Sequence, residues 1–199
     1  MPNADDSLPV TSPTLSRAFE ALVLVFNARK INYAIIGGLA VIQHGRVRTT
    51  DDVDALLSVP QLAMPGLFEA LAAKGFTIDL RKNILELRDT GLTSIQFENV
   101  IVDLMRPVVP AYAHILDHAL QSQILGHSVR VSSAEGLIIM KLIAFRPQDQ
   151  ADIQDLMAAY SGQLDMDFVR TELDSILESD DPRWATLEQW IRDIGTMPK

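Results

Sequence analysis

The spacing of hydrophobic residues along the chain predicts a helix first, then a region of short strands, and helices again at the end. Leu15 and Phe19 recur at helical spacing after Ser12-Pro13, a serine that can cap a helix followed by a proline suited to its first turn. We expect this helix to end near Lys30. Residues 1–12 are polar and show no periodicity, which predicts a loose terminus.

Short apolar runs bounded by glycine, asparagine and aspartate predict the strands of one sheet. Two helices interrupt the strands, over Leu39–His44 and Gln61–Lys74, and Pro65 is placed to split the start of the second. We expect a mixed sheet whose second half is an antiparallel meander. The predicted strands are Tyr33–Ile36, Asp52–Leu57, Phe76–Leu80, Ile84–Leu87, Thr93–Phe97 and Val100–Met105.

The rest of the chain is predicted to be helical apart from one hairpin, formed by Gln123–Leu125 and Ser128–Val131. The sequence Ser-Ser-Ala-Glu from Ser132 to Glu135 is typical of a capping box and predicts a helix that reaches Phe145. The fold class is therefore α+β, with a core over residues 13–131 and a helical C-terminal part over residues 132–199. The other predicted helices are Tyr112–Leu120, Gln148–Tyr160, Asp165–Glu178 and Pro182–Ile194.

Composition and charge exclude several classes of protein. The 199 residues include no cysteine, which excludes disulfides, thiolate catalysis and cysteine-bound zinc. The net charge is −9, and residues 149–199 hold twelve acidic and four basic side chains, so the chain is a poor general binder of nucleic acid. A local basic surface at Arg46 and Arg48 is the exception that the sequence allows. We find no signal-peptide pattern and no membrane-spanning run, and expect a cytoplasmic protein with no membrane partner.

Two acidic residues open the second predicted strand. Asp52 and Asp54 alternate with Val53, so both carboxylates point to the same face of the strand. Two like charges side by side repel each other unless a cation lies between them, and Mg²⁺ prefers such oxygen ligands together with substrate phosphates. The alternative is an exposed acidic turn with no ligand.

Asp103 is the single polar residue in the run Val100–Met105, which predicts a strand buried on both faces. A buried carboxylate needs a partner or a metal ion. With Asp52 and Asp54 on a neighbouring strand, Asp103 would complete a two-metal site of the kind used in phosphoryl transfer. The alternative is an aspartate at the strand edge with a backbone partner.

Glycine and lysine give two further signals. Gly37-Gly38 lies between a predicted strand and a helix, where backbone amides can bind phosphate, although most such pairs are only turns. Lys141 is the one charged residue in an apolar helix, so its ammonium either extends to solvent or meets an anion, which is a nucleoside triphosphate or an internal carboxylate. Asp149 and Asp152 open the next helix, where they either favour the helix dipole or contact Lys141 or Arg48.

Taken together, these residues resemble the nucleotidyltransferase superfamily. The pattern comprises Gly37-Gly38, the spacing Arg48-x-Thr50-x-Asp52-x-Asp54, and Asp103 on a later strand. With Lys141 and the segment Arg146-Pro147-x-Asp149-x-x-Asp152, it looks like the abortive-infection nucleotidyltransferase toxins of type IV toxin–antitoxin systems. The resemblance covers roughly Tyr33 to Leu156, and it implies a nucleotidyltransferase-like mixed sheet flanked by helices.

The resemblance also implies chemistry. Magnesium, as two ions and with manganese as a substitute, would be held by Asp52, Asp54 and Asp103, and Asp103 would help activate an acceptor hydroxyl. The implied partners are a nucleoside triphosphate such as ATP, a tRNA acceptor and a cognate antitoxin. Alternatives are a small-molecule nucleotidyltransferase of the antibiotic-modifying kind and a non-catalytic binding module with the same fold. The residues implied to bind the nucleotide are Gly37, Gly38, Arg48, Thr50, Lys141 and Asp152.

Overall fold

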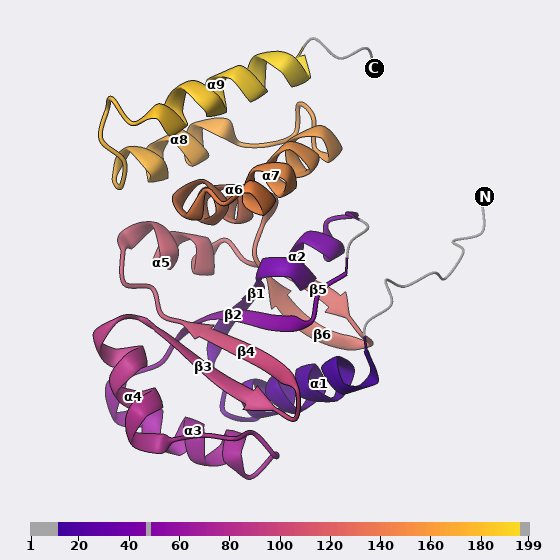
Figure 1. Cartoon of the computed structure of the whole chain (residues 1–199), viewed down its shortest axis with the longest axis vertical. Helices are drawn as coiled ribbons and strands as arrows, with labels where there is room; N and C mark the ends of the chain where they lie inside the picture. The colour runs from indigo at the N-terminus through magenta and orange to yellow at the C-terminus, as the bar shows by residue number, and fades with distance from the viewer. Residues whose placement is uncertain (1–11, 47–48, 196–199) are drawn as a thin grey trace, which may run out of the picture.

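A computed structural model describes residues 12–46 and 49–195 of the chain. The described part contains one six-stranded sheet with helices on both faces, and further helices stack beyond its edge (Figure 1). The α+β class with a mixed sheet is confirmed. The strands are β1 (Asn32–Ile36), β2 (Asp52–Ser58), β3 (Leu92–Phe97), β4 (Val100–Met105), β5 (Leu120–Ile124) and β6 (His127–Val131).

Apart from α4, the helices follow the order that the hydrophobic pattern predicted. The helix at the N-terminal end is capped as predicted, because the Ser12 hydroxyl accepts a hydrogen bond from the backbone N–H of Leu15 at 3.1 Å. The helices are α1 (Pro13–Ala28), α2 (Gly37–Gln43), the short 3-10 helix η1 (Gln61–Ala63), α3 (Met64–Ala72), α4 (Leu80–Asp89), α5 (Pro110–Asp117), α6 (Ala134–Ala144), α7 (Pro147–Ala159), α8 (Met166–Asp174) and α9 (Pro182–Gly195).

The strand order is β3-β4-β2-β1-β6-β5. The central strands β4 and β2 are parallel, β2 and β1 are antiparallel, and β1 and β6 are parallel. Antiparallel hairpins, β3–β4 and β5–β6, form the two ends of the sheet. This order places β2 and β4 side by side although η1, α3, α4 and β3 separate them in sequence, so residues far apart in the chain share one face.

One face of the sheet is buried against α1, which contacts β2, β4 and β6. Val53, Ala55 and Leu57 of β2 point to this face and are fully buried, as are the α1 residues Phe19 and Phe26. The opposite face carries α2 and α5, and α2 also contacts α6. The acidic side chains of β2 lie on this second face, between the sheet and the helices that follow β6.

The predicted meander is wrong in its first half. Ile84–Leu87 lies inside helix α4, and Phe76–Leu80 makes only an isolated bridge to β3. Asp79 caps α4 by accepting a hydrogen bond from the backbone N–H of Lys82 at 3.0 Å. Asn83 is buried, and its side-chain amide donates a hydrogen bond to the Thr93 hydroxyl at 2.8 Å. These polar contacts stabilise a helix where the apolar run alone suited a strand equally well.

The predicted capping box at the start of α6 is also wrong in detail. The N-cap is Ser133, whose hydroxyl accepts from the backbone N–H of Gly136 at 3.2 Å. Since the third helical position is then a glycine, no reciprocal carboxylate contact forms there. Glu135 instead accepts from the backbone N–H of Asp165, at 3.2 Å, and links α6 to the start of α8.

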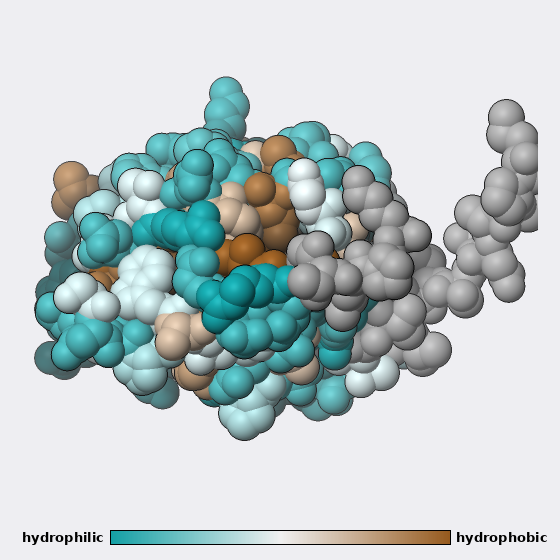
Figure 2. Space-filling model, turned by 90° about the horizontal axis from the view of Figure 1, so that it is seen from above, coloured by the Kyte–Doolittle hydropathy of each residue, from teal (hydrophilic) through white to brown (hydrophobic). Residues whose placement is uncertain are grey.

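The helices after β6 form a separate layer at one end of the molecule. Helix α6 contacts α7 and α8, and α7 contacts α9. Seen from the side of these helices, the surface is mostly hydrophilic (Figure 2), in keeping with the acidic composition of this part of the chain. Within residues 12–46 and 49–195, no helix combines the length and the apolar character that crossing a bilayer requires.

Candidate active site

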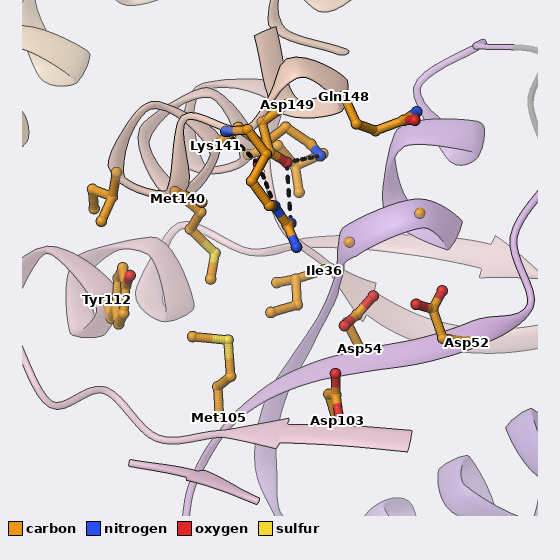
Figure 3. Close-up of a pocket in the computed structure, with 16 residues that line it drawn as sticks. Ile36, Asp52, Asp54, Asp103, Met105, Tyr112, Met140, Lys141, Gln148 and Asp149 are labelled. Carbon is orange, nitrogen blue, oxygen red and sulfur yellow. Dashed lines mark hydrogen bonds and ion pairs between the residues drawn. The ribbon is translucent and has the colours of Figure 1, made fainter. Parts of the chain in front are cut away.

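Three carboxylates meet on the face of the sheet that points away from α1. Asp54 of β2 lies directly opposite Asp103 of β4 in the parallel register, and Asp52 precedes Asp54 on the same face. Figure 3 shows the three side chains in one region, at one end of a cavity. The sequence predicted this meeting, and the pairing of β2 with β4 produces it.

The expectation that β4 is buried on both faces is wrong. Val102 and Leu104 are fully buried, whereas Ile101 is 51% exposed and Asp103 is half-buried. Asp103 is therefore a residue of the open face and not of the core. Its carboxylate accepts a hydrogen bond from the Ser94 hydroxyl of β3 at 2.5 Å.

The glycine pair starts α2 directly against Asp54. Gly37 has a φ of +63°, and a Cβ atom there would lie 1.8 Å from Oδ2 of Asp54. Only glycine fits both the left-handed backbone and this close approach. The buried Gly38 follows in the first turn of α2, and its backbone N–H donates a hydrogen bond to Asp54.

The carboxylate of Asp54 is partly buried and close to two other negative charges. Burial raises the pKa of Asp54, and the neighbouring charges of Asp52 and Asp103 raise it further, to about 6. The backbone of Gly38 and the charge of Lys141 act in the opposite direction without cancelling this effect. Asp52 receives a hydrogen bond from the hydroxyl of the buried Thr50 at 2.5 Å, so Thr50 orients a carboxylate at the rim of the site.

The cavity has a volume of about 410 Å³ and two chemically different ends. Its acidic end contains the three carboxylates and the glycine pair. At its other end it is lined by apolar side chains from β4, α5 and α6. These are Met105, Tyr112, Leu137, Met140 and Ile143, of which Met105, Tyr112 and Met140 can be followed in Figure 3.

Lys141 lies at the wall of this cavity but is engaged by carboxylates. Its Nζ is 2.7 Å from Oδ2 of Asp152 and 3.3 Å from Oδ1 of Asp149, and only 10% of its side chain is exposed. The contact between Lys141 and the start of α7 that the sequence suggested is present. Asp152 is fully buried, does not line the cavity, and also lies 3.2 Å from Nε of Arg46.

Several lining residues carried no clear signal in the sequence. Gln148 lies at the start of α7 and had no signal in the sequence, whereas Arg146 belonged to the segment that carried the resemblance but was assigned no role. Tyr112 and Met140 fit the helical apolar pattern and so read as core. Which residues face the carboxylates depends on the strand order, and the local sequence pattern does not specify that order.

Arg48, which the resemblance assigned to the nucleotide, lies outside the described residues. The structure brings together Gly37, Gly38, Asp52, Asp54 and Asp103, with Thr50 hydrogen-bonded to Asp52 and Lys141 on the opposite wall. Asp152 is set back from this group behind Lys141.

The donor chemistry of the acidic end fits a divalent cation. Carboxylate oxygens are the ligands that Mg²⁺ prefers, and the pKa of Asp54 is raised first by burial and then by the charges of Asp52 and Asp103, a repulsion that a cation would relieve. Neighbouring strands lie about 4.8 Å apart, so Asp54 and Asp103 are within reach of one ion. As the side chains stand, however, no three His, Cys, Asp or Glu residues in the described ranges converge as a preformed metal site.

Comparison with solved structures finds the same fold at low sequence identity. A crystal structure of ANT(2")-Ia in complex with adenylyl-2"-tobramycin matches with a TM-score of 0.55 and 14% identity, covering 89% of this chain and 99% of that one. A solution structure of the antibiotic-resistance factor ANT(2'')-Ia matches with a TM-score of 0.52 and 16% identity, covering 92% and 100%. At these identities the likeness shows the fold alone.

Sequence comparison is more specific. Curated protein sequences give no significant match to this chain. The family model described as a nucleotidyltransferase of unknown function (DUF6036) matches residues 14–193, which span the sheet, the cavity and the C-terminal helices. The chain therefore belongs to this family of nucleotidyltransferases.

Proposed function

We propose that this chain is a magnesium-dependent enzyme that transfers a nucleoside monophosphate from a nucleoside triphosphate to an acceptor hydroxyl. The observation that carries the proposal is the meeting of Asp52, Asp54 and Asp103 beside the N-terminus of α2. In this reaction the acceptor oxygen bonds to the α-phosphorus, the bond from that phosphorus to the bridging oxygen breaks, and pyrophosphate leaves.

The residues divide this work between them. Asp52, Asp54 and Asp103 would hold the metal, which supplies positive charge to the phosphates and to the leaving group. The glycine pair that starts α2 would allow phosphate oxygens to approach the backbone closely, because neither residue carries a side chain there. Asp103 lies towards the open edge formed by β3 and is suited to accept the proton of the acceptor hydroxyl. Such catalysis is mostly positioning and neutralisation of charge.

For the acceptor, the described structure favours a small hydroxyl compound. The cavity has the size of a small-molecule site, about 410 Å³, and residues 149–199 carry twelve acidic and four basic side chains, which disfavours a polyanionic RNA. The fold matches ANT(2")-Ia over nearly that whole chain, and the solved complex of that protein holds adenylylated tobramycin. The resemblance to type IV toxins instead supports tRNA as acceptor and an antitoxin as partner, so tRNA is the rival acceptor.

The catalytic proposal is tested with α-labelled triphosphates, Mg²⁺ and a mixture of acceptors. We expect pyrophosphate release and labelled product from the wild-type chain, and a loss of at least about 100-fold in the double variant Asp52→Asn, Asp54→Asn. The variant should unfold at the same or a higher temperature, because it removes carboxylates that repel one another. The matched control is Asp51→Asn, an exposed neighbour outside the cavity, which should keep full activity.

The same assay decides the acceptor. Label on an aminoglycoside-type compound but not on tRNA supports the small-molecule acceptor, and label on tRNA alone overturns it. If neither pyrophosphate nor labelled product forms under any acceptor tried, and no triphosphate binds with Mg²⁺ present, the chain is a binding module with a nucleotidyltransferase fold.

A further inference from the structure

Among the residues that the structure describes, two cationic side chains border the cavity, and they differ in what they are free to bind. Lys141 is 10% exposed in its side chain and already contacts two buried carboxylates. Arg146 is 74% exposed in its side chain and lies at the same wall. A ligand in the cavity can reach Arg146 without breaking a buried ion pair, whereas it would have to displace Asp149 or Asp152 to reach the Lys141 ammonium.

Arg146 is nevertheless held in one orientation. Its Nε and Nη2 donate to Asp149 at 2.7 and 3.3 Å, and its backbone N–H donates to the same carboxylate at 3.1 Å. Within the described ranges, Nη1 has no hydrogen-bond partner. One edge of the guanidinium is therefore fixed by protein and the other edge remains available.

Asp149 can hold Arg146 in one orientation because the Asp149 side chain is itself fixed by burial and by Lys141. Its side chain is 1% exposed, and Lys141 donates to its second oxygen. Burial by itself would raise the pKa of Asp149, but hydrogen bonds from Arg146 and the charge of Lys141 keep that pKa below its ordinary value. Lys141, Asp149 and Arg146 thus form a chain of contacts that runs from the interior of α6 to the cavity.

Arg146 is also close enough to Asp54 and Asp52, two of the carboxylates that would bind the metal, to be affected by their charges. The charges of Asp54 and Asp52 both favour its protonated form, in addition to the larger effect of Asp149. A guanidinium beside carboxylates that would bind a metal is well placed for the phosphates that such a metal accompanies. Its planar fork matches two phosphate oxygens, which a lysine ammonium does not.

We propose that Arg146 is the side chain that binds the β- and γ-phosphates of the triphosphate and the pyrophosphate released from it, and that Lys141 serves to hold the Asp149 that orients it. This assignment rests on the proposed function for the identity of the ligand. It gives Lys141 a supporting position in place of the direct phosphate contact that the sequence suggested.

The test measures binding of labelled inorganic pyrophosphate in the presence of Mg²⁺, together with the KM for triphosphate. Loss of one charge-assisted bidentate contact is worth roughly 10- to 100-fold. We therefore expect Arg146→Gln to weaken pyrophosphate binding and raise KM by that factor, and Arg146→Lys to recover only part of the loss. The melting temperature should fall by less than in a variant that loses Lys141, because Asp149 keeps the Lys141 ammonium and the backbone N–H of residue 146 in both variants.

The control is Arg88→Gln, which removes an exposed arginine that is also paired with an aspartate, at 2.5 Å, but lies outside the cavity. It changes the net charge equally and should leave pyrophosphate binding within about twofold of wild type. Unchanged pyrophosphate binding and unchanged KM in Arg146→Gln would overturn the assignment. If the wild-type chain transfers no nucleotide at all, the proposed function fails. The pyrophosphate measurement still shows whether Arg146 binds phosphate groups.

Discussion

Replacing Lys141 with methionine tests whether this lysine is a structural residue. The change keeps the length of the side chain and its fit among the apolar residues of α6, but it removes the ammonium. Nζ of Lys141 lies 2.7 Å from Asp152 and 3.3 Å from Asp149, and both carboxylates are at most 1% exposed. In the variant, two buried negative charges lose the cation that they share.

The expected cost follows from that burial. Breaking a buried ion pair by removing one partner costs about 3–5 kcal/mol, because the remaining charge stays desolvated. Here each carboxylate keeps an arginine, Arg146 at 2.7 Å from Asp149 and Arg46 at 3.2 Å from Asp152, so the lower end applies. About 3 kcal/mol in a domain of this size corresponds to a decrease in melting temperature of roughly 6–12 °C.

The assay is urea unfolding at neutral pH with thermal melting beside it. Lys82→Met is the matched control, since Lys82 also lies in a helix and pairs with Glu86 four residues later, but at 3.7 Å and with 63% of its side chain exposed. We expect less than about 0.5 kcal/mol for this control. If Lys141→Met unfolds within about 0.5 kcal/mol of wild type and its KM for triphosphate rises sharply, the structural account of Lys141 is refuted.

The half of the site that is contiguous in sequence could be predicted without the structure. The glycine pair, Thr50, Asp52 and Asp54 lie on one strand–helix–strand unit, and alternation along a strand already fixes which side chains share a face. Asp103 was identified by its polarity in an apolar run. Its proximity to Asp54 depends on the parallel pairing of β2 with β4, which nothing local in the sequence specifies.

The errors have a common physical origin. The local hydrophobic pattern predicts a strand at Ile84–Leu87 and burial of both faces of β4. It does so because hydrophobicity indicates that a residue is buried but not which neighbouring element buries it. Asn83 stabilises α4 through Thr93 of another element, and one side of β4 remains open because no helix covers Ile101. Tertiary contacts therefore decide both outcomes.

The charged residues show the same limit. Lys141 was recognisable as anomalous in its apolar helix, and a contact of Asp149 and Asp152 to Lys141 or Arg48 was one of the two alternatives that the sequence left open. It could not show that Asp149 uses its second side to orient Arg146, since that depends on how α6 and α7 meet. Arg146, the accessible cation among the described residues of the cavity, was consequently not among the residues that the sequence assigned to the nucleotide.

Two further predictions concern the stability of the chain at acidic pH and the role of Gly37. The pKa of Asp181 is lowered to about 2 by hydrogen bonds from Arg183, so this carboxylate contributes stability above its unfolded pKa, and that contribution is lost as pH falls from about 4 towards 2. The difference in urea midpoint between wild type and Asp181→Asn should therefore shrink on acidification from about pH 6 to about pH 3, and a constant difference would contradict this account. Gly37→Ala should destabilise the fold by more than the roughly 1–2 kcal/mol cost of a left-handed alanine, because its Cβ would lie 1.8 Å from Oδ2 of Asp54. Gly126→Ala isolates that cost, since Gly126 also has a positive φ, of +78°, but no atom within 4 Å of its Cβ position. Equal losses of stability in the two variants, with nucleotide transfer retained in Gly37→Ala, would show that Gly37 serves only the turn and that Asp54 does not require its space.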